Sequence, residues 1–397
     1  MTNNRVLISG AGIAGSTLAY WLSRYGFDVT VVERAARLPT GGNGVDVREQ
    51  AIEVVERMGL FEQVRALATD AVGMAFVDAK GDVRTRIDMQ ALQRSANGRD
   101  VEILRGDLAR LLHDAARDRV EYVFGDVVRA LEEDSSGVSV ELASGGTRRF
   151  DVVVGADGIH SSVRRMVFGS EERFLRFDRH YFAVWEVDAS YGEARWIRMY
   201  NEPGRMAGVW RAGNQSRAHA NFVFHRREPL SYDYRDVDAQ RAHLREAFAG
   251  AGWRTQELLE QAAADPEFFF DALCQVHMPA WSKGRVALVG DAAYCASPTS
   301  GAGALLSLIG AYVLAGEMAA AADDQVAAFR AYDAAFRPEV VKRQKQLYTG
   351  MLVPKSRAAI WARNVLFRSP VIGALAGLQP RKATPLRAYQ APAGALS

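Results

Sequence analysis

Three glycines near the start of the chain have the spacing of a loop that binds a phosphate. Gly10, Gly12 and Gly15 follow an apolar run that begins at Val6. Gly10 would allow a tight turn, Gly12 would let the backbone approach a pyrophosphate, and Gly15 would let the next helix pack against the strand. The free N–H groups at the start of that helix would face the anion. This spacing predicts pyrophosphate binding.

A carboxylate at the end of the next apolar run strengthens this prediction. Leu18 and Leu22 lie on one face of a helix that Gly26 ends, and the run from Asp28 leads to Glu33. A bare glycine motif would also fit an ordinary turn, but strand, helix, strand and acid together form a dinucleotide-binding βαβ unit. Glu33 would accept hydrogen bonds from the ribose hydroxyls. Its charge would repel a 2′-phosphate, which favours FAD or NAD over NADP.

Two later strands also end in glycine and an acid. The apolar run at 150–154 leads to Asp157–Gly158, and the run at 285–289 leads to Gly290–Asp291. Open α/β sheets bind ligands at the carboxyl ends of their strands. Because such strand ends recur across the whole chain, we predict one long, extended cofactor.

The composition is that of an ordinary soluble globular protein. The 397 residues are 49% hydrophobic and 24% charged, and the net charge of +2 offers no attraction to nucleic acid or to an acidic membrane. The start of the chain lacks a signal peptide, so we expect a cytoplasmic protein. Arg357, Arg363 and Arg368 interrupt the apolar C-terminal stretches, so we expect no membrane span. Cys274 and Cys295 are expected to be reduced core thiols.

Between about 174 and 270 the pattern changes to short alternating runs separated by turns, which predicts an antiparallel sheet. Aromatic residues in these runs would suit a flat apolar ligand, or they would simply form the core. The candidates for substrate contact are Trp210, Phe222 and Phe224.

The resulting domain plan has three parts. We expect a cofactor domain over 1–72, 99–172 and 272–325, a substrate domain over 73–98 and 173–271, and a C-terminal helical segment over 326–397. The helical segment would pack across the domain junction or cover the nucleotide sheet. Ser369–Pro370 would start a last short helix, and residues 381–397 would form a frayed tail.

In this order and spacing, the motifs resemble the three fingerprints of class A, single-component FAD-dependent aromatic hydroxylases of the para-hydroxybenzoate hydroxylase type. The residues that carry this resemblance are Gly10, Gly12, Gly15 and Glu33, then Asp157, Gly158, Ser162 and Arg164, then Gly290, Asp291, Pro298, Gly301 and Gly303. Gly41, Gly42, Asp46, Arg48 and 104–108 resemble the branch of tetracycline-inactivating and polyketide-tailoring monooxygenases. The resemblance covers nearly the whole chain.

The resemblance implies an α/β fold, with a Rossmann-like FAD-binding domain, an antiparallel-sheet substrate domain and C-terminal helices. It implies that non-covalent FAD is contacted by Gly10, Gly12, Ala14, Gly15, Glu33, Arg34, Asp46, Arg48, Arg105, Asp157, Gly290, Asp291, Pro298, Gly301, Ala302, Gly303 and Ala304. Backbone N–H groups of 301–303 would face the isoalloxazine ring, and Asp157 would serve both FAD and the nicotinamide cosubstrate. Ala302, Ala304 and Leu305 replace amide residues common in relatives, so the ring edge would be less polar.

In the family it resembles, NADPH or NADH reduces FAD, O2 adds at C4a, and the hydroperoxyflavin transfers its distal oxygen to an electron-rich carbon. The expected substrate is a small aromatic molecule or a polycyclic phenol or enol, such as a polyketide or a tetracycline. No catalytic triad is needed because the flavin carries the chemistry. No metal-ligand spacing occurs, and we expect a monomer or a weak dimer.

Three alternatives stay open. A Baeyer–Villiger or epoxidising outcome would use the same scaffold. A halogenase is disfavoured because the Trp-x-Trp-x-x-Pro signature is absent and Lys80 lies in an expected surface turn. A flavin-binding protein that only sequesters its ligand would not consume NADPH.

Overall fold

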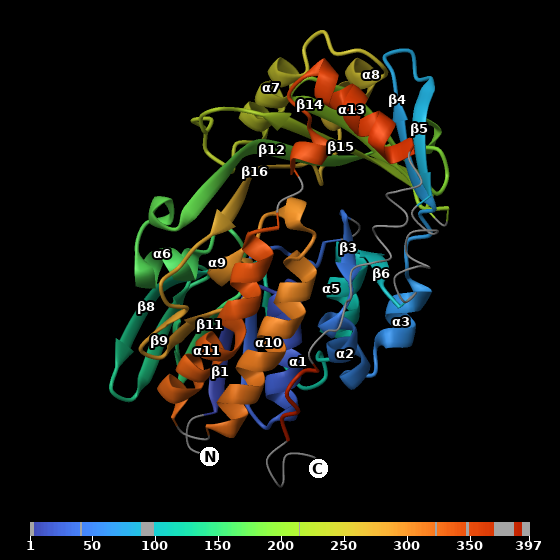
Figure 1. The fold of residues 1–397 in the computed structure, drawn as a ribbon. Coiled ribbons are helices and arrows are strands. Elements are labelled where there is room, and N and C mark those ends of the chain that lie inside the picture. Colours follow the sequence, from blue (N-terminus) through green and yellow to red (C-terminus); the bar gives the residue numbers. More distant parts are fainter. Residues whose placement is uncertain are drawn as a thin grey trace.

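The computed structural model describes residues 4–39, 42–88, 99–213, 215–321, 324–346, 349–368 and 385–390. Gly41, residues 89–98 of the expected substrate domain, and the expected helix at Ser369–Pro370 lie outside these ranges. The described chain forms a lower part built on a six-stranded sheet and an upper part built on a seven-stranded sheet (Figure 1).

The lower sheet has the strand order β17-β18-β11-β1-β2-β7. Its strands are β17 (Ser282–Lys283), β18 (Val286–Leu288), β11 (Val152–Gly155), β1 (Arg5–Ser9), β2 (Asp28–Glu33) and β7 (Glu121–Phe124). All neighbours are parallel except β17 and β18. The apolar residues of β1 and β11 are fully buried because helices cover the sheet, as parallel sheets require.

Helices and two small sheets surround this lower sheet. The helices are α1 (Ile13–Arg24), α2 (Gln50–Arg57), α3 (Phe61–Ala66), α5 (Arg105–Asp114), α6 (Ser162–Phe168), α9 (Asp291–Tyr294), α10 (Gly303–Ala320) and α11 (Gln325–Gln344). Strand β3 (Gly44–Val47) pairs with β6 (Val101–Leu104), and β8 (Val128–Asp134), β9 (Gly137–Leu142) and β10 (Thr147–Phe150) form a three-stranded sheet. The short 3-10 turns are Glu171–Arg173, Ala189–Tyr191 and Pro298–Ser300.

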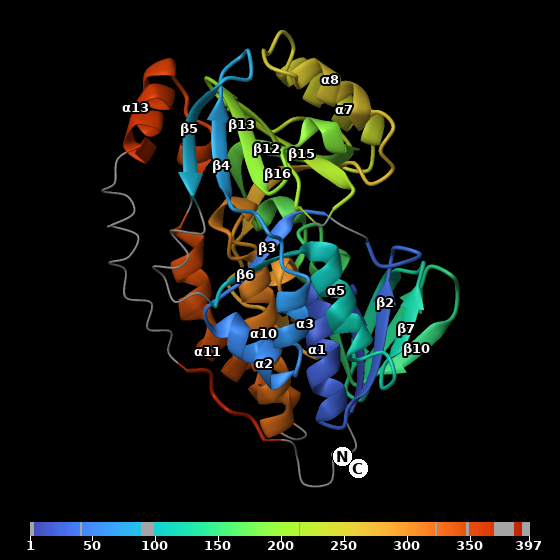
Figure 2. The same ribbon diagram turned by 90° about the vertical axis from the view of Figure 1, so that its right-hand side faces the viewer.

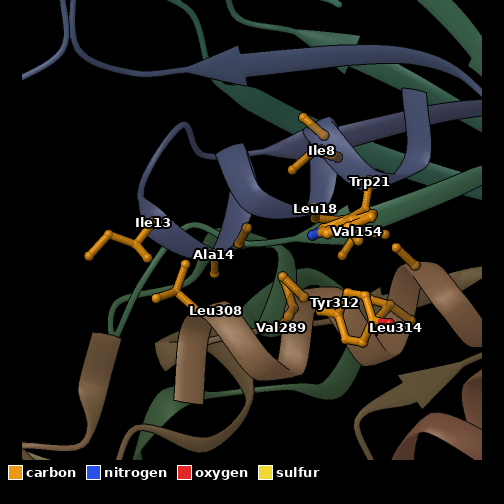
Figure 3. Close-up of a cluster of buried hydrophobic side chains, with 14 of the residues drawn as sticks. Ile8, Ile13, Ala14, Leu18, Trp21, Val154, Val289, Leu308, Tyr312 and Leu314 are labelled. Atoms are coloured by element: carbon orange, nitrogen blue, oxygen red, sulfur yellow. The ribbon is translucent and has the colours of Figure 1, made fainter. Parts of the chain in front are cut away.

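The core of the lower part lies where α1 packs against α10 (Figure 3). Leu18 and Trp21 of α1 face Tyr312 of α10, and the rings of Trp21 and Tyr312 are 5.0 Å apart. Burying a side chain such as Leu18 stabilises the fold by about 1.5–3 kcal/mol. Helix α10 is long and apolar enough to span a membrane, but most of it is buried within the protein, as in a core helix.

The upper sheet has the strand order β16-β12-β15-β14-β13-β4-β5. Its strands are β4 (Gly73–Val77), β5 (Val83–Asp88), β12 (Leu175–Asp188), β13 (Trp196–Glu202), β14 (Arg205–Trp210), β15 (Arg217–His225) and β16 (Phe269–Val276). Its pairs are antiparallel except β4 with β13, because β4 enters from the lower part as a crossover. The segment at 73–88 thus joins a sheet formed mainly by residues after 174.

Helices lie on both faces of the upper sheet. α7 (Val237–Ala247) and α8 (Thr255–Ala262) cover the face that points away from the lower part (Figures 1 and 2). α12 (Thr349–Leu352) and α13 (Arg357–Arg368) follow α11, and Val353 and Phe367 pack on the opposite face. The C-terminal segment therefore contacts both parts of the molecule.

The expectation of a frayed tail is wrong for the described residues 385–390. Tyr389 donates a hydrogen bond to Glu317 of α10 at 2.7 Å, and Arg387 forms an ion pair with the same carboxylate at 2.9 Å. Arg57 of α2 donates to the carbonyl of Leu386 at 3.1 Å. These polar contacts hold the tail against the lower part.

Candidate functional site

The glycine turn after β1 has the geometry that the spacing predicts. Gly10 has a φ of +105°, and its N–H donates to the carbonyl of Val32 at 2.7 Å. A Cβ on Gly15 would lie 1.9 Å from the carbonyl oxygen of Gly10, whereas a Cβ on Gly12 would meet nothing within 4 Å. The first and third glycines therefore serve close packing, and Gly12 faces open space at the start of α1.

Glu33 is fixed beside this turn by two backbone N–H groups. Its carboxylate accepts hydrogen bonds from Ala11 at 2.8 Å and from Ala35 at 2.8 Å. Each carboxylate oxygen retains a further lone pair for a ligand hydroxyl. The acid thus both closes the turn and presents an acceptor.

Glu33 and Gly12 line a cavity of about 1010 Å³. Among the described residues, its walls come from two of the three strand ends, Gly10–Glu33 and Asp157–Gly158, and from neighbouring residues; the third, Gly290–Asp291, does not line it. The predicted residues among them are Gly10, Gly12, Glu33, Arg34, Arg105 and Asp157. This cavity is large enough for an extended ligand.

Asp157 holds the start of α6. Its carboxylate accepts from the backbone N–H of Ser162 at 2.7 Å and from the Ser162 hydroxyl at 2.8 Å, and it accepts from Ser161 as well. The buried Arg164 donates to the carbonyl of Ala292 at 2.8 Å. The second segment is thereby joined to the third.

Gly290 brings the third segment against the first. A Cβ on Gly290 would lie 2.7 Å from the Cβ of Ala14, and the backbone φ at Gly290 is +67°. The small side chain of Ala14 therefore lets Gly290 pack closely against α1. Burial raises the pKa of the neighbouring Asp291 carboxyl, and Arg105 acts in the opposite direction.

The glycine-rich turn before α10 meets β3. Arg48 donates to the carbonyl of Gly301 at 3.0 Å and lies 3.5 Å from Asp46. The N–H of Gly301 is used by Pro298 at 3.1 Å, and that of Ala302 by the Ser300 hydroxyl at 3.2 Å. This limits the expectation that 301–303 all offer donors.

Within the described chain, only Gly303 of these three keeps an N–H without a protein acceptor, at the N-terminus of α10. A Cβ on Gly303 would meet nothing within 4 Å. Ala302 and Ala304 are buried, so their side chains point into the protein. Among the described residues, the turn therefore offers one backbone donor to a ligand, the N–H of Gly303.

Basic and acidic side chains lie together at the far end of the cavity. His160 lies between Asp271 at 3.0 Å and Glu171 at 2.9 Å, and its ring stacks on Tyr234 at 4.3 Å. Burial alone would lower the pKa of His160, but the hydrogen bonds to Asp271 and Glu171 raise it to about 9. Arg37, Arg165 and Arg235 line the same end.

Two of the three predicted substrate contacts, Phe222 and Phe224, lie in the core of the upper part instead. Phe222 and Phe224 are buried against Phe248 of α7, with ring centroids 4.6 and 6.1 Å apart. Because alternate residues of a strand face opposite sides, these two rings point away from the lower part. They belong to the core, while Trp210 lies on the opposite side of the sheet, which is the face toward the lower part.

Sequence reasoning missed His219 and Asn221, which share that face with Trp210. The rings of Trp210 and His219 stack at 4.7 Å. His219 is only 4% exposed, yet among the described residues neither ring nitrogen has a hydrogen-bond partner, and Asn221 Oδ1 also lacks one. His219 Nε2 lies 3.9 Å from Glu186, and burial lowers its pKa. The sequence could have indicated these residues, since both are polar and occupy alternate positions in an otherwise apolar strand.

Tyr294 and Cys295, which follow Asp291 in the chain, are packed in the core. The Tyr294 hydroxyl lies 3.0 Å from that of Tyr332, and Cys295 donates to the carbonyl of Cys274 at 3.5 Å. Burial raises the pKa of both Tyr294 and Cys295. Both cysteines are free thiols, and neither side chain is poised to ionise.

Known proteins share this arrangement. Residues 3–338 match a family described as FAD binding domain. A flavin-dependent monooxygenase of Legionella longbeachae is 36% identical over 86% of this chain and 87% of its own length. An uncharacterized Mycobacterium tuberculosis protein is 42% identical over 85% and 91%.

Two solved structures extend this similarity to the fold. The tetracycline destructase Tet(51) superposes with a TM-score of 0.84 at 33% identity, covering 98% of this chain and all of that one. Klebsiella pneumoniae HpxO, in complex with FAD and uric acid, superposes with a TM-score of 0.70 at 25% identity and covers 95% and 97%. Both alignments span the lower and upper parts together.

Proposed function

Because this chain belongs to the FAD-binding-domain family and is a class A FAD monooxygenase that resembles tetracycline-inactivating enzymes, we propose that it hydroxylates a polycyclic phenol or enol with NAD(P)H and O2. The observation that carries the proposal is the cavity lined by the Gly10–Glu33 and Asp157–Gly158 segments, against which Gly290 packs the third segment. Bound FAD would supply the redox chemistry. The protein would supply orientation and a dry site.

The residues present fit FAD. Gly12 leaves open space at a helix N-terminus, where N–H groups would receive the pyrophosphate. Glu33 would receive ribose hydroxyls, and Gly303 would donate its N–H to the ring. Arg48 would hold the Gly301 turn beside the ring through its bond to the Gly301 carbonyl.

Basic side chains at the far end of the cavity support a dinucleotide reductant. Arg165 and Arg235 line the cavity beside His160, whose hydrogen bonds to Asp271 and Glu171 favour its protonated form. Guanidinium groups bind phosphates through charge-assisted hydrogen bonds. We propose that the phosphates of NAD(P)H dock at this end.

The lower face of the upper sheet supports a flat, oxygen-rich substrate. The rings of Trp210 and His219 stack on one another, and Asn221 and His219 offer buried polar atoms that have no hydrogen-bond partner among the described residues. Unpaired buried groups are costly unless a ligand satisfies them. A polycyclic enol would stack on the rings and exchange hydrogen bonds with the imidazole and the amide, as we propose for a tetracycline-like or polyketide substrate.

The test uses purified protein. Acid precipitation should release FAD, and a panel of tetracyclines and polycyclic phenols should stimulate NADPH or NADH oxidation. Mass spectrometry with isotopically labelled O2 should then show one oxygen atom in the product. FAD release without any stimulated oxidation or oxygen transfer would reject the monooxygenase proposal in favour of a ligand-sequestering protein.

A further inference from the structure

Helix α13 is fixed to the upper sheet by its inner face. The guanidinium of Arg363 lies 3.9 Å above the ring of Phe76, and the ring of Phe367 stacks on Phe76 at 5.8 Å. Arg368 donates to the Thr85 hydroxyl of β5 at 3.2 Å. The helix is thus docked at an outer edge of the molecule (Figure 2).

The outer face of α13 is apolar. Trp361 is 69% exposed, Leu366 51% and Val365 44%. Ala358 and Ala362 lie between them at helical spacing and are exposed as well. A surface helix normally carries polar side chains on its outer face, so an apolar face of this kind indicates a binding surface.

Basic residues precede and begin this helix. From residue 340 to the end, the chain carries no aspartate or glutamate. Of its basic residues, Arg343 and Arg387 are ion-paired with acids of the lower part. Lys355 and Arg357 are exposed at the start of α13, and neither has an acidic partner within the described chain. The net charge of +2, which argued against an acidic membrane, conceals this segregation.

We propose that α13 docks this protein on an anionic lipid surface. Trp361, Val365 and Leu366 would enter the boundary between headgroups and acyl chains, where amphipathic helices with exposed tryptophan bind. Lys355 and Arg357 would contact lipid phosphates, each cation contributing about 1 kcal/mol near an anionic surface. A second copy of the chain is a poorer partner, because pairing two such faces would bring their cations together.

Vesicle co-sedimentation of the full-length, FAD-loaded protein tests the proposal. Binding to vesicles that contain phosphatidylglycerol should exceed binding to pure phosphatidylcholine about tenfold or more at low salt. Added salt should weaken the preference, since it screens exposed charges. Equal binding to both vesicles, or no binding to either, overturns the proposal.

Substitutions locate the surface. The double variant Trp361→Gln with Leu366→Gln should lose about tenfold in binding to anionic vesicles while its FAD content stays unchanged. Lys355→Gln with Arg357→Gln should lose the preference for anionic lipid. Val326→Gln is the matched control, because Val326 is 41% exposed on the distant α11.

Two further outcomes contradict the proposal. Undiminished binding by the Trp361/Leu366 variant would place the lipid contact elsewhere. A dimer in analytical ultracentrifugation that this variant abolishes would make the face an interface between copies of the chain.

Discussion

The glycine turn after β1 borders the cavity, and the lower face of the upper sheet carries the proposed substrate contacts, yet the two are built differently. In the turn, backbone atoms form the contact surface. A Cβ on Gly15 would overlap them, whereas a Cβ on Gly12 would enter open space. On the sheet the side chains are the surface, and His219 and Phe222 of one strand point to opposite sides. A backbone site is therefore specified by glycine spacing, whereas a side-chain site depends on which face the helices cover.

The largest effect should come from removing the packing glycine of the turn. We expect Gly15→Ala to destabilise the protein by more than about 4 kcal/mol, because its Cβ would overlap the Gly10 carbonyl, which is backbone and cannot rotate away. Thermal unfolding and the soluble yield measure this. Gly12→Ala is the control and should fold normally. Equal stability of the two variants would contradict the claim that Gly15, and not Gly12, is required for close packing.

The opposite side of the sheet gives the next largest effect. Phe222→Ala should cost about 3–5 kcal/mol, as expected for a buried aromatic side chain. Its folded fraction should keep the wild-type KM for substrate, since the ring faces α7. A raised KM with unchanged stability would return Phe222 to the substrate site.

Gly12→Val separates binding from folding. The apoprotein should unfold at the wild-type temperature because the added atoms enter open space, while FAD affinity falls about 100-fold or more. Flavin content and a fluorescence titration with FAD are the measurements. A flavin-replete variant would show that no pyrophosphate lies at Gly12.

His160 connects the two regions, and its pH dependence tests that connection. Its pKa is about 9 in the folded protein against an ordinary 6.5, so its stabilisation is complete below pH 6.5 and is lost as the pH rises through 9. The loss should reach about 3 kcal/mol at most. Urea unfolding midpoints across this range should show a smaller decline for His160→Gln; an identical decline would assign the pH dependence to other groups.

The smallest effect belongs to the ligand-facing side of the sheet. His219→Ala should cost less stability than Phe222→Ala, because it removes only the stacking on Trp210 and, among the described residues, no hydrogen bond of the ring nitrogens. The KM for substrate should rise about tenfold, corresponding to one hydrogen bond. Wild-type KM together with a loss of stability would make His219 a core residue.

The same contrast explains what the sequence could predict. Gly10, Gly12, Gly15 and Glu33 were predictable because each meets a steric or hydrogen-bonding need that spacing reveals. The strands of the upper sheet were predictable from the alternation of apolar and polar residues. Which side of the sheet each residue faces was not predictable, since Phe222 and Phe224 suit a ligand site and a core equally well. The ordered tail at 385–390 could not be foreseen, because its partners Glu317 and Arg57 lie far away in sequence.

The contact between α1 and α10 has a consequence for how the chain folds. Trp21 meets Tyr312 only after about 290 further residues have been made, which takes roughly 15–60 s at typical rates of synthesis. During that interval the apolar face of α1 is without its native cover on the ribosome. We therefore expect the newly made N-terminal half to depend on chaperones, and folding to be slow because these contacts span so much of the chain.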